Sequence, residues 1–116
     1  MSTFSAILAT ILGVVFVAVA VPKLTGQQQL VDEFKRWGYA DAIRVATGAV
    51  ELLAGVLLLV GIALPALAIS GVLLVIFVML GALATHLRAR DRFAQWLPPV
   101  VLLALALTLV ISLLPE

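Results

Sequence analysis

Residues 42–87 read AIRVATGAVELLAGVLLLVGIALPALAISGVLLVIFVMLGALATHL and decide the fold, because they form one predominantly apolar run. A helix rises about 1.5 Å per residue, and the hydrocarbon core of a bilayer is about 30 Å thick. A single helix of this length would project far beyond the bilayer, so the chain must turn within the run. Gly61 and Pro65 mark the turn, since proline is tolerated in the first turn of a new helix.

Two further apolar segments flank this run, so the sequence predicts four membrane-spanning segments. Such segments must be helices, because lipid offers no partner for free backbone N–H and C=O groups. The predicted fold is an all-α, antiparallel bundle of four transmembrane helices that forms a single integral membrane domain over residues 1–116. We expect Asp41 to be the N-cap of the second helix. The spans are expected at about residues 3–21, 42–64, 65–87 and 97–114.

The first span has one alternative interpretation, which is a cleaved signal peptide. Residues 18–20 (AVA) resemble a cleavage site. However, the region before this span contains no Lys or Arg, which a signal peptide should have. The sequence therefore favours a retained transmembrane helix.

The composition excludes several classes of protein. Hydrophobic residues make up 65% of the chain and charged residues 11%, whereas a soluble domain is near half apolar and a quarter charged. A soluble fold of this length could not bury so much apolar surface, so the expected partner is a lipid bilayer. The chain has no cysteine and one histidine, so no haem or metal site is evident. Nucleic acid is not expected as a partner, because no basic patch with interleaved aromatic residues lies outside the membrane-flanking loops.

Between the first two spans, residues 27–37 have the pattern of a short amphipathic helix. The apolar residues of this segment fall on one helical face, at positions i, i+1, i+4 and i+7. They are Leu30, Val31, Phe34 and Trp37. Gly38 suits the position just after the helix, where a left-handed conformation is common. We predict a helix that lies in the membrane interface, with a plain polar loop as the alternative.

The basic residues are confined to two of the predicted loops and their flanks. The N-terminus, the second loop and the C-terminus hold none. The basic residues are Lys23, Lys35, Arg36, Arg44, Arg88, Arg90 and Arg92. The positive-inside rule therefore predicts a multi-pass protein of the cell membrane whose first and third loops are cytoplasmic and whose two termini lie outside.

Glu51 is the one charged residue in the interior of a predicted span. An ionisable group at such a position is energetically expensive and normally faces a partner or a cavity. Lys23 ends the first helix on the same side of the membrane, and Thr85 and His86 end the third. Long side chains reach along a helix, so Lys23 can point inward. We therefore expect Lys23, Glu51 and His86 to converge in the cytoplasmic half of the bundle.

Two interpretations of these polar residues stay open. In the first, they form a ligand-binding site whose members are Lys23, Thr47, Glu51, Thr85 and His86. In the second, Lys23 and Glu51 tie two helices together, because polar contacts hold membrane helices to one another, and His86 has a structural role at the interface. No nucleophile–base arrangement or nucleotide-binding glycine motif is visible, so catalytic residues stay unassigned.

Four stretches together carry a resemblance to a known family. They are VPKLTG at residues 21–26, FKRWGY at 34–39, GAVELLAG at 48–55 and GALATHLRARD at 81–91. Their order and spacing over nearly the whole chain resemble the DoxX-like family of small four-helix membrane proteins. A minor departure is AVAVP at residues 18–22, where the family usually has a small residue or glycine just before the lysine motif.

The resemblance implies that Lys23, Glu51 and the Thr85–His86 pair are characteristic polar positions of the family. It also implies a connection with redox systems, since some relatives are named as parts of quinone-linked thiosulfate-oxidising systems and others are linked to oxidoreductase assemblies. Because the chain lacks cysteine, direct sulfur redox chemistry by its own residues is not expected.

Three functions are compatible with these observations. The first is binding of a small lipophilic molecule, with a quinone as the candidate cofactor, in which Glu51 exchanges a proton while Lys23 and His86 bind oxygens of the ligand. The second is a non-enzymatic scaffold subunit of a membrane oxidoreductase assembly. The third is a proton-coupled small-molecule transporter, which the lopsided charge fits less well. Whether the chain is an enzyme stays open, and a homo-oligomer is expected because its small residues leave lipid-facing surfaces that can pair.

Overall fold

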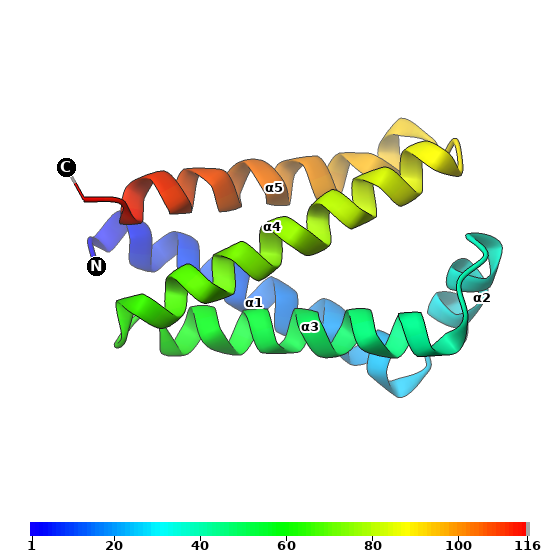
Figure 1. Cartoon of the computed structure of the whole chain (residues 1–116), viewed down its shortest axis with the longest axis horizontal. Helices are drawn as coiled ribbons and strands as arrows, with labels where there is room; N and C mark the ends of the chain where they lie inside the picture. The colour runs from blue at the N-terminus through cyan, green and yellow to red at the C-terminus, as the bar shows by residue number, and fades with distance from the viewer. Residues whose placement is uncertain (116) are drawn as a thin grey trace.

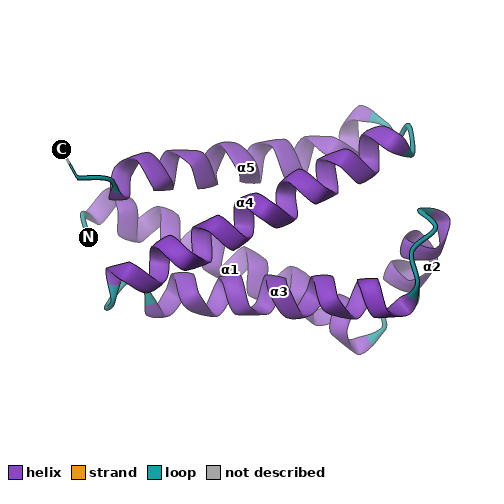
Figure 2. Cartoon of the chain, viewed as in Figure 1, coloured by secondary structure: helices purple, strands orange, loops and turns teal. Residues whose placement is uncertain are grey.

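The computed structural model describes residues 1–115, which form helices joined by short loops (Figure 2). Four helices are long and apolar enough to cross a membrane, which confirms the predicted bundle of four spans. A short helix lies between the first two, so the alternative of a plain polar loop is wrong. The helices are α1 (Thr3–Thr25), α2 (Gln28–Arg36), α3 (Asp41–Val60), α4 (Pro65–Arg88) and α5 (Phe93–Leu113).

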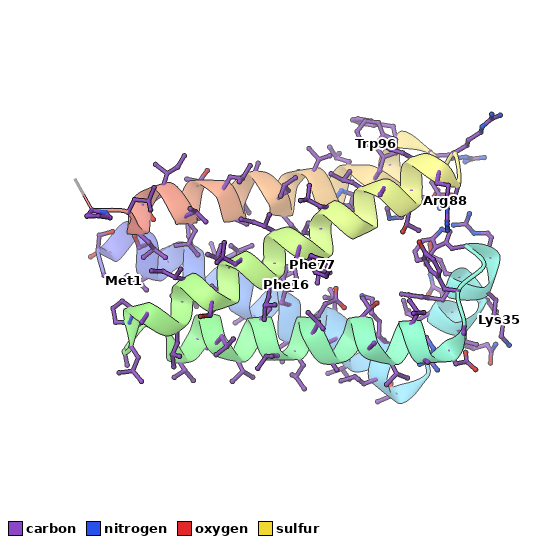
Figure 3. The ribbon with its side chains drawn as sticks, viewed as in Figure 1. Met1, Phe16, Lys35, Phe77, Arg88 and Trp96 are labelled. Atoms are coloured by element: carbon purple, nitrogen blue, oxygen red, sulfur yellow. The ribbon has the colours of Figure 1, made fainter. Side chains whose placement is uncertain are left out.

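The four long helices run alternately in opposite directions (Figure 1). α1 packs against α3 and α5, and α4 packs against the same two helices, so that the four helices close into a ring. The beginning of α1 and the end of α5 lie together at one end of the bundle (Figure 1). α2 lies at the other end, which we call the α2 end, and Lys35 and Arg88 lie there too (Figure 3).

The turn between α3 and α4 occurs at Gly61 and Pro65, as predicted. Pro65 is at the first position of α4, where a helix needs no N–H of its own. A Cβ atom on Gly61 would lie only 2.5 Å from the backbone nitrogen of Ala68, so a larger residue would push the two helices apart. α3 and α4 are therefore in close contact at this hairpin, and they separate toward the α2 end (Figure 1).

Glycines also allow α1 and α3 to pack closely. A Cβ atom on Gly55 of α3 would lie 2.8 Å from the carbonyl oxygen of Gly13 on α1. Nearer the α2 end, a Cβ atom on Gly48 would lie 3.0 Å from the Cβ of Lys23. Membrane helices use small residues in this way because close packing replaces the hydrophobic force that drives helices together in water. These contacts fix the end of α1, and with it Lys23, against α3.

Apolar side chains fill the centre of the bundle and also cover its outside. The largest fully buried apolar side chains are Phe16, Leu12, Leu58, Leu109, Val72 and Val75. On the outside, large apolar residues are exposed along all four long helices, with Phe77 reaching 72% exposure. Such a surface is stable only when lipid surrounds it, which agrees with a membrane location.

The helix ends differ from the predicted ones in four places, and one of them is the end of α3, which lies at Val60 and about one turn before the expected residue 64. α1 continues past residue 21 through Pro22 to Thr25, and Gly26 caps it in the left-handed conformation. The prediction of Asp41 as an N-cap is wrong, because Ala40 is the N-cap and Asp41 is the first residue of α3. Its carboxylate still suits this position, since the helix dipole favours negative charge in the first turn. α5 begins at Phe93, about one turn earlier than expected from apolarity alone.

Candidate functional site

An ion pair joins two helices in the half of the bundle nearer α2. Nζ of Lys23 on α1 lies 2.9 Å from Oε1 of Glu51 on α3. Both side chains are largely buried, since 15% of Lys23 and 3% of Glu51 is exposed. A buried charge is expensive unless it is paired, so each side chain offsets part of the cost of burying the other. The predicted approach of Lys23 to Glu51 is therefore found as a direct contact.

The Glu51 carboxylate has little other support from the chain. Within residues 1–115, Oε1 has no contact with a hydrogen-bond donor apart from Nζ of Lys23. Thr47 lies one turn earlier, but its hydroxyl donates to the carbonyl of Ile43 over 2.7 Å. A carboxylate with unused acceptor capacity can accept a hydrogen bond from a bound molecule.

Arg44 of α3 holds the end of α1 in place. Its Nη1 donates a hydrogen bond to the carbonyl of Lys23, which is near the end of a helix, where carbonyl groups lack partners within the helix. Its Nη2 lies 3.8 Å from Oδ1 of Asp41. Arg44 thus binds the backbone of Lys23, while the side chain of Lys23 turns toward Glu51.

Asp91, between α4 and α5, is the centre of a second polar cluster. Its Oδ1 accepts a hydrogen bond from Nη1 of Arg36 over 2.8 Å, and its Oδ2 accepts one from Nε1 of Trp37 over 3.2 Å. Nδ1 of His86 lies 2.7 Å from the same Oδ2. One carboxylate therefore ties α2 and the residue after it to the end of α4. Asp91 closes the GALATHLRARD stretch, but its partners lie up to 55 residues away, so no local pattern indicates its role.

These contacts lower the pKa of Asp91. The hydrogen bond from Arg36 is the largest cause, and those from His86 and Trp37 add to it, so that the pKa falls from 3.8 to about 2 although burial opposes the change. The same hydrogen bond to Asp91 raises the pKa of the Arg36 guanidinium above its usual value. Asp91 is therefore ionised at neutral pH, and we assign the proton on Nδ1 of His86 to the hydrogen bond with it. Nε2 is then the ring nitrogen that is left for a further contact.

Aromatic and polar contacts hold the segment after α2 against α4. The ring of Trp37 packs edge-on against His86, with 5.2 Å between the ring centroids. The hydroxyl groups of Tyr39 and Thr85 share a hydrogen bond of 2.8 Å. Nη2 of Arg88 donates to the carbonyl of Trp37 over 2.8 Å. The α2 segment therefore forms a fixed cover over this end of the bundle.

A cavity of about 1200 Å³ lies behind this cover, between α1, α3, α4 and the start of α5. All five predicted ligand-binding residues line it: Lys23, Thr47, Glu51, Thr85 and His86. Of these five, Lys23 and Glu51 contact one another. His86 instead bonds to Asp91, and Thr85 bonds to Tyr39 and to the carbonyl of Gly81. His86 therefore lines the same cavity as the Lys23–Glu51 ion pair. Within residues 1–115, it forms no hydrogen bond or ion pair with either of these two residues.

Most of the cavity wall is apolar, and part of it reaches the outer surface. A Cβ atom added to Gly81 would meet no atom within 4 Å, so open space lies in front of this residue. Phe77 also lines the cavity although it is highly exposed, and its label in Figure 3 lies over the region between α4 and α3. Within residues 1–115, no group of three or more His, Cys, Asp or Glu residues is placed to hold a metal ion. An apolar space with a few polar groups suits a molecule with an apolar body and a polar head.

The fold and the site define a small multi-pass membrane protein with a partly polar cavity at one end of a four-helix bundle. Residues 7–109 match the family model described as the DoxX-like family, and the chain belongs to this family. The match covers most of the chain, which confirms the resemblance that its four sequence stretches carry. No match was found among the curated proteins or among the solved structures.

Proposed function

We propose that this protein binds a small lipophilic molecule with a polar head in the cavity at the α2 end. The observation that carries the proposal is the cavity itself, whose volume of about 1200 Å³ is ample for a drug-sized ligand. The glycine contacts between α1 and α3 show close packing elsewhere in this bundle, whereas the space at the α2 end stays open and reaches the lipid-facing surface, where a molecule from the bilayer can enter it.

The polar head would lie beside the Lys23–Glu51 pair. The Lys23 ammonium has three N–H donors. Nζ donates a hydrogen bond to the carbonyl of Val19 over 3.4 Å and lies 2.9 Å from Oε1 of Glu51 in an ion pair. Donor capacity is therefore left for an oxygen of the ligand. Nε2 of His86 and the hydroxyl oxygen of Thr47, on the same cavity wall, offer acceptors for a hydroxyl group.

A quinone has the chemistry that this arrangement favours. Its ring carbonyls accept hydrogen bonds, its reduced form donates them, and its chain is apolar. Lys23 would donate to an oxygen of the ring, Nε2 of His86 would accept a hydrogen bond from a hydroxyl group of the reduced form, and Thr85 would contribute to the polar part of the wall. Glu51 would exchange a proton with the ring, because its carboxylate has acceptor capacity that the chain leaves unused.

The ligand would enter from the bilayer between α3 and α4. These helices are in contact at their hairpin and separate toward the α2 end (Figure 1). Exposed apolar residues of both helices line the cavity at this separation, among them Ile43 on α3 and Phe77 and Leu80 on α4. A lipophilic molecule dissolved in the leaflet would therefore reach the site without crossing water.

The α2 end would face the cytoplasm. Lys35 and Arg88 lie at this end, and the remaining basic residues belong to the same two loops and their flanks. The positive-inside rule assigns such loops to the cytoplasm. The cavity would then open into the cytoplasmic leaflet, with both chain termini on the outer side.

Native mass spectrometry of the protein extracted in mild detergent tests the proposal. The wild type is expected to carry a lipophilic molecule whose mass indicates its chemical class. A double variant, Ala46→Phe with Gly81→Phe, adds two aromatic rings to the cavity from α3 and α4, since both residues line it. This variant is expected to lose the bound molecule, because the rings occupy the space that the ligand needs.

A matched control places the same two rings on the same helices but outside the cavity. Ala49→Phe with Ala84→Phe changes two exposed residues that do not line the cavity, and this variant should keep the ligand. Equal binding in the two double variants would contradict the proposal. A wild type that carries no small molecule, binds no added decylbenzoquinone and retains a protein partner would favour a scaffold function instead.

A further inference from the structure

The charges that line the cavity are compensated within the protein. The charged or titratable residues of the lining are Lys23, Glu33, Tyr39, Glu51 and His86. Lys23 pairs with Glu51 at 2.9 Å, and Glu33 lies 3.6 Å from Nη2 of Arg36. Within residues 1–115, no Lys or Arg that lines the cavity lacks an acidic partner.

Three arginines near the cavity are engaged elsewhere. Arg36 bonds to the carboxylate of Asp91. Arg44 and Arg88 donate to backbone carbonyl groups. None of these three arginines lines the cavity. Arginine is the residue that most often binds a carboxylate or phosphate through two parallel hydrogen bonds. The described part of the lining offers no arginine for such a contact.

Two backbone carbonyl groups at the start of α5 lack a helical donor. Pro98 and Pro99 have no N–H group, so the carbonyls of Ala94 and Gln95, four residues earlier, lack their usual helical donor. All four residues line the cavity. Oε1 of Gln95 accepts a hydrogen bond from the backbone N–H of Arg92 over 3.1 Å, which leaves the side-chain NH₂ group as a donor. Carbonyl oxygens of this kind repel an anion but accept a hydrogen bond from a hydroxyl group.

We infer that the cavity selects amphiphiles with a neutral head that bears carbonyl or hydroxyl groups, that it rejects anionic lipids, and that Glu51 sets this selectivity by neutralising Lys23. The inference rests on the proposed function and narrows its class of ligand. An anionic head would have to leave water and approach Lys23 beside the Glu51 carboxylate, so repulsion and desolvation both oppose its binding. A neutral head forms the same hydrogen bonds without adding a charge. The site can therefore exclude fatty acids and acidic phospholipids while it admits neutral molecules.

A matched pair of probes tests this selectivity. Oleyl alcohol and oleate have the same chain and differ in the head, and the carboxylate of free oleate is ionised at about pH 8. Each radiolabelled probe is titrated against purified protein in a neutral detergent. Binding to the Ala46→Phe/Gly81→Phe variant is subtracted, because two added rings obstruct its cavity. The wild type is expected to bind the alcohol at least ~10-fold more tightly than oleate.

Two variants test the role of Glu51. Glu51→Gln removes the negative charge and keeps the shape of the side chain, so the ratio of the affinity for the alcohol to that for oleate should fall at least ~10-fold. Glu33→Gln is the matched control, because Glu33 also lines the cavity but has Arg36 as its partner. This control should change the ratio of the two affinities less than ~3-fold, as expected for a more exposed ion pair.

The possible results separate the inference from the proposed function. Equal wild-type affinities for the two probes would overturn the inference and leave the proposed function standing. If the wild type binds neither probe more strongly than the Ala46→Phe/Gly81→Phe variant does, the proposed function itself is contradicted. If the Glu51→Gln protein folds and keeps the wild-type ratio of the affinities for the alcohol and oleate, Glu51 does not set the selectivity. If that variant does not fold, Thr47→Lys adds a cation one turn from Glu51, and a failure of this cation to increase oleate binding would equally overturn the inference.

Discussion

Nζ of Lys23 and Oε1 of Glu51 lie 2.9 Å apart and join the end of α1 to α3 at the wall of the cavity. Gly48 makes this contact possible, because a Cβ atom at this position would lie 3.0 Å from the Cβ of Lys23. The pair compensates two buried charges and also leaves hydrogen-bonding capacity toward the cavity. Stability and ligand binding should therefore respond together to changes at these two residues.

Lys23→Met should destabilise the protein more than replacement of both members of the pair. The single change leaves Glu51, which is 3% exposed, without its cation. The expected loss in the free energy of unfolding is about 3 kcal/mol for the single variant and under ~1 kcal/mol for Lys23→Met/Glu51→Leu. Unfolding by sodium dodecyl sulfate, followed by circular dichroism in mixed micelles, measures both. A double variant that is as unstable as Lys23→Met, or less stable, would show that the charge left on Glu51 is not the cause of the loss.

Two glycine-to-alanine changes should have opposite effects. Gly55→Ala places a Cβ atom 2.8 Å from the carbonyl oxygen of Gly13 and should cost about 1–3 kcal/mol by overpacking α1 against α3. Gly81→Ala meets no atom within 4 Å and should be neutral or stabilising by up to ~1 kcal/mol, since alanine is the better helix former. The same unfolding assay compares them, and a destabilising Gly81→Ala would mean that the space before this residue is filled.

Asp91→Asn should loosen the cover that α2 forms over the cavity. The change removes the ion pair with Arg36 and weakens the hydrogen bonds from Trp37 and His86. Trypsin cleavage at Lys35 should become about 10-fold faster, because cleavage requires α2 to open. Asp32→Asn is the control, since Asp32 bonds to Gln28 within α2 itself. Equal rates for the two variants would show that Asp91 does not hold α2.

Acid should release the same cover. Asp91 has a pKa of about 2 when it is bound by Arg36 and an ordinary pKa of 3.8 when it is free. Protonation therefore favours the released form, so the stabilisation is complete above pH 3.8 and is lost as the pH falls through about 2. In a Trp96→Phe background, the fluorescence of Trp37 should report this transition. Asp91→Asn should abolish it, and a transition that persists in this variant would assign the effect to another group.

The spans and the hairpin turn are predictable from the sequence because the bilayer sets a simple length requirement. Gly61 and Pro65 mark the turn by chemistry that acts locally. The approach of Lys23 to Glu51 follows from topology, since the predicted spans place both on the same side. Apolarity alone does not place helix ends, because polar residues such as Thr25 continue a helix into the interface.

The second polar cluster and the cavity lie beyond what the sequence indicates. Asp91 meets Arg36 across 55 residues, through a loop geometry that no local pattern encodes. The cavity exists because α3 and α4 separate toward the α2 end, and the angle between two helices depends on all of their packing contacts. For His86, the sequence predicts the end of the bundle at which it lies, but it does not predict the hydrogen bond to Asp91.

A lipophilic molecule with a polar head is proposed to occupy the cavity beside the Lys23–Glu51 pair. The most direct test is a crystal structure of the protein grown in a lipid phase with a decylbenzoquinone that carries bromine on its ring. An anomalous bromine signal is expected within the cavity, with a ring oxygen about 3 Å from Nζ of Lys23. Bromine found only on the outer, lipid-facing surfaces, with side chains filling the space between α3 and α4, would contradict it.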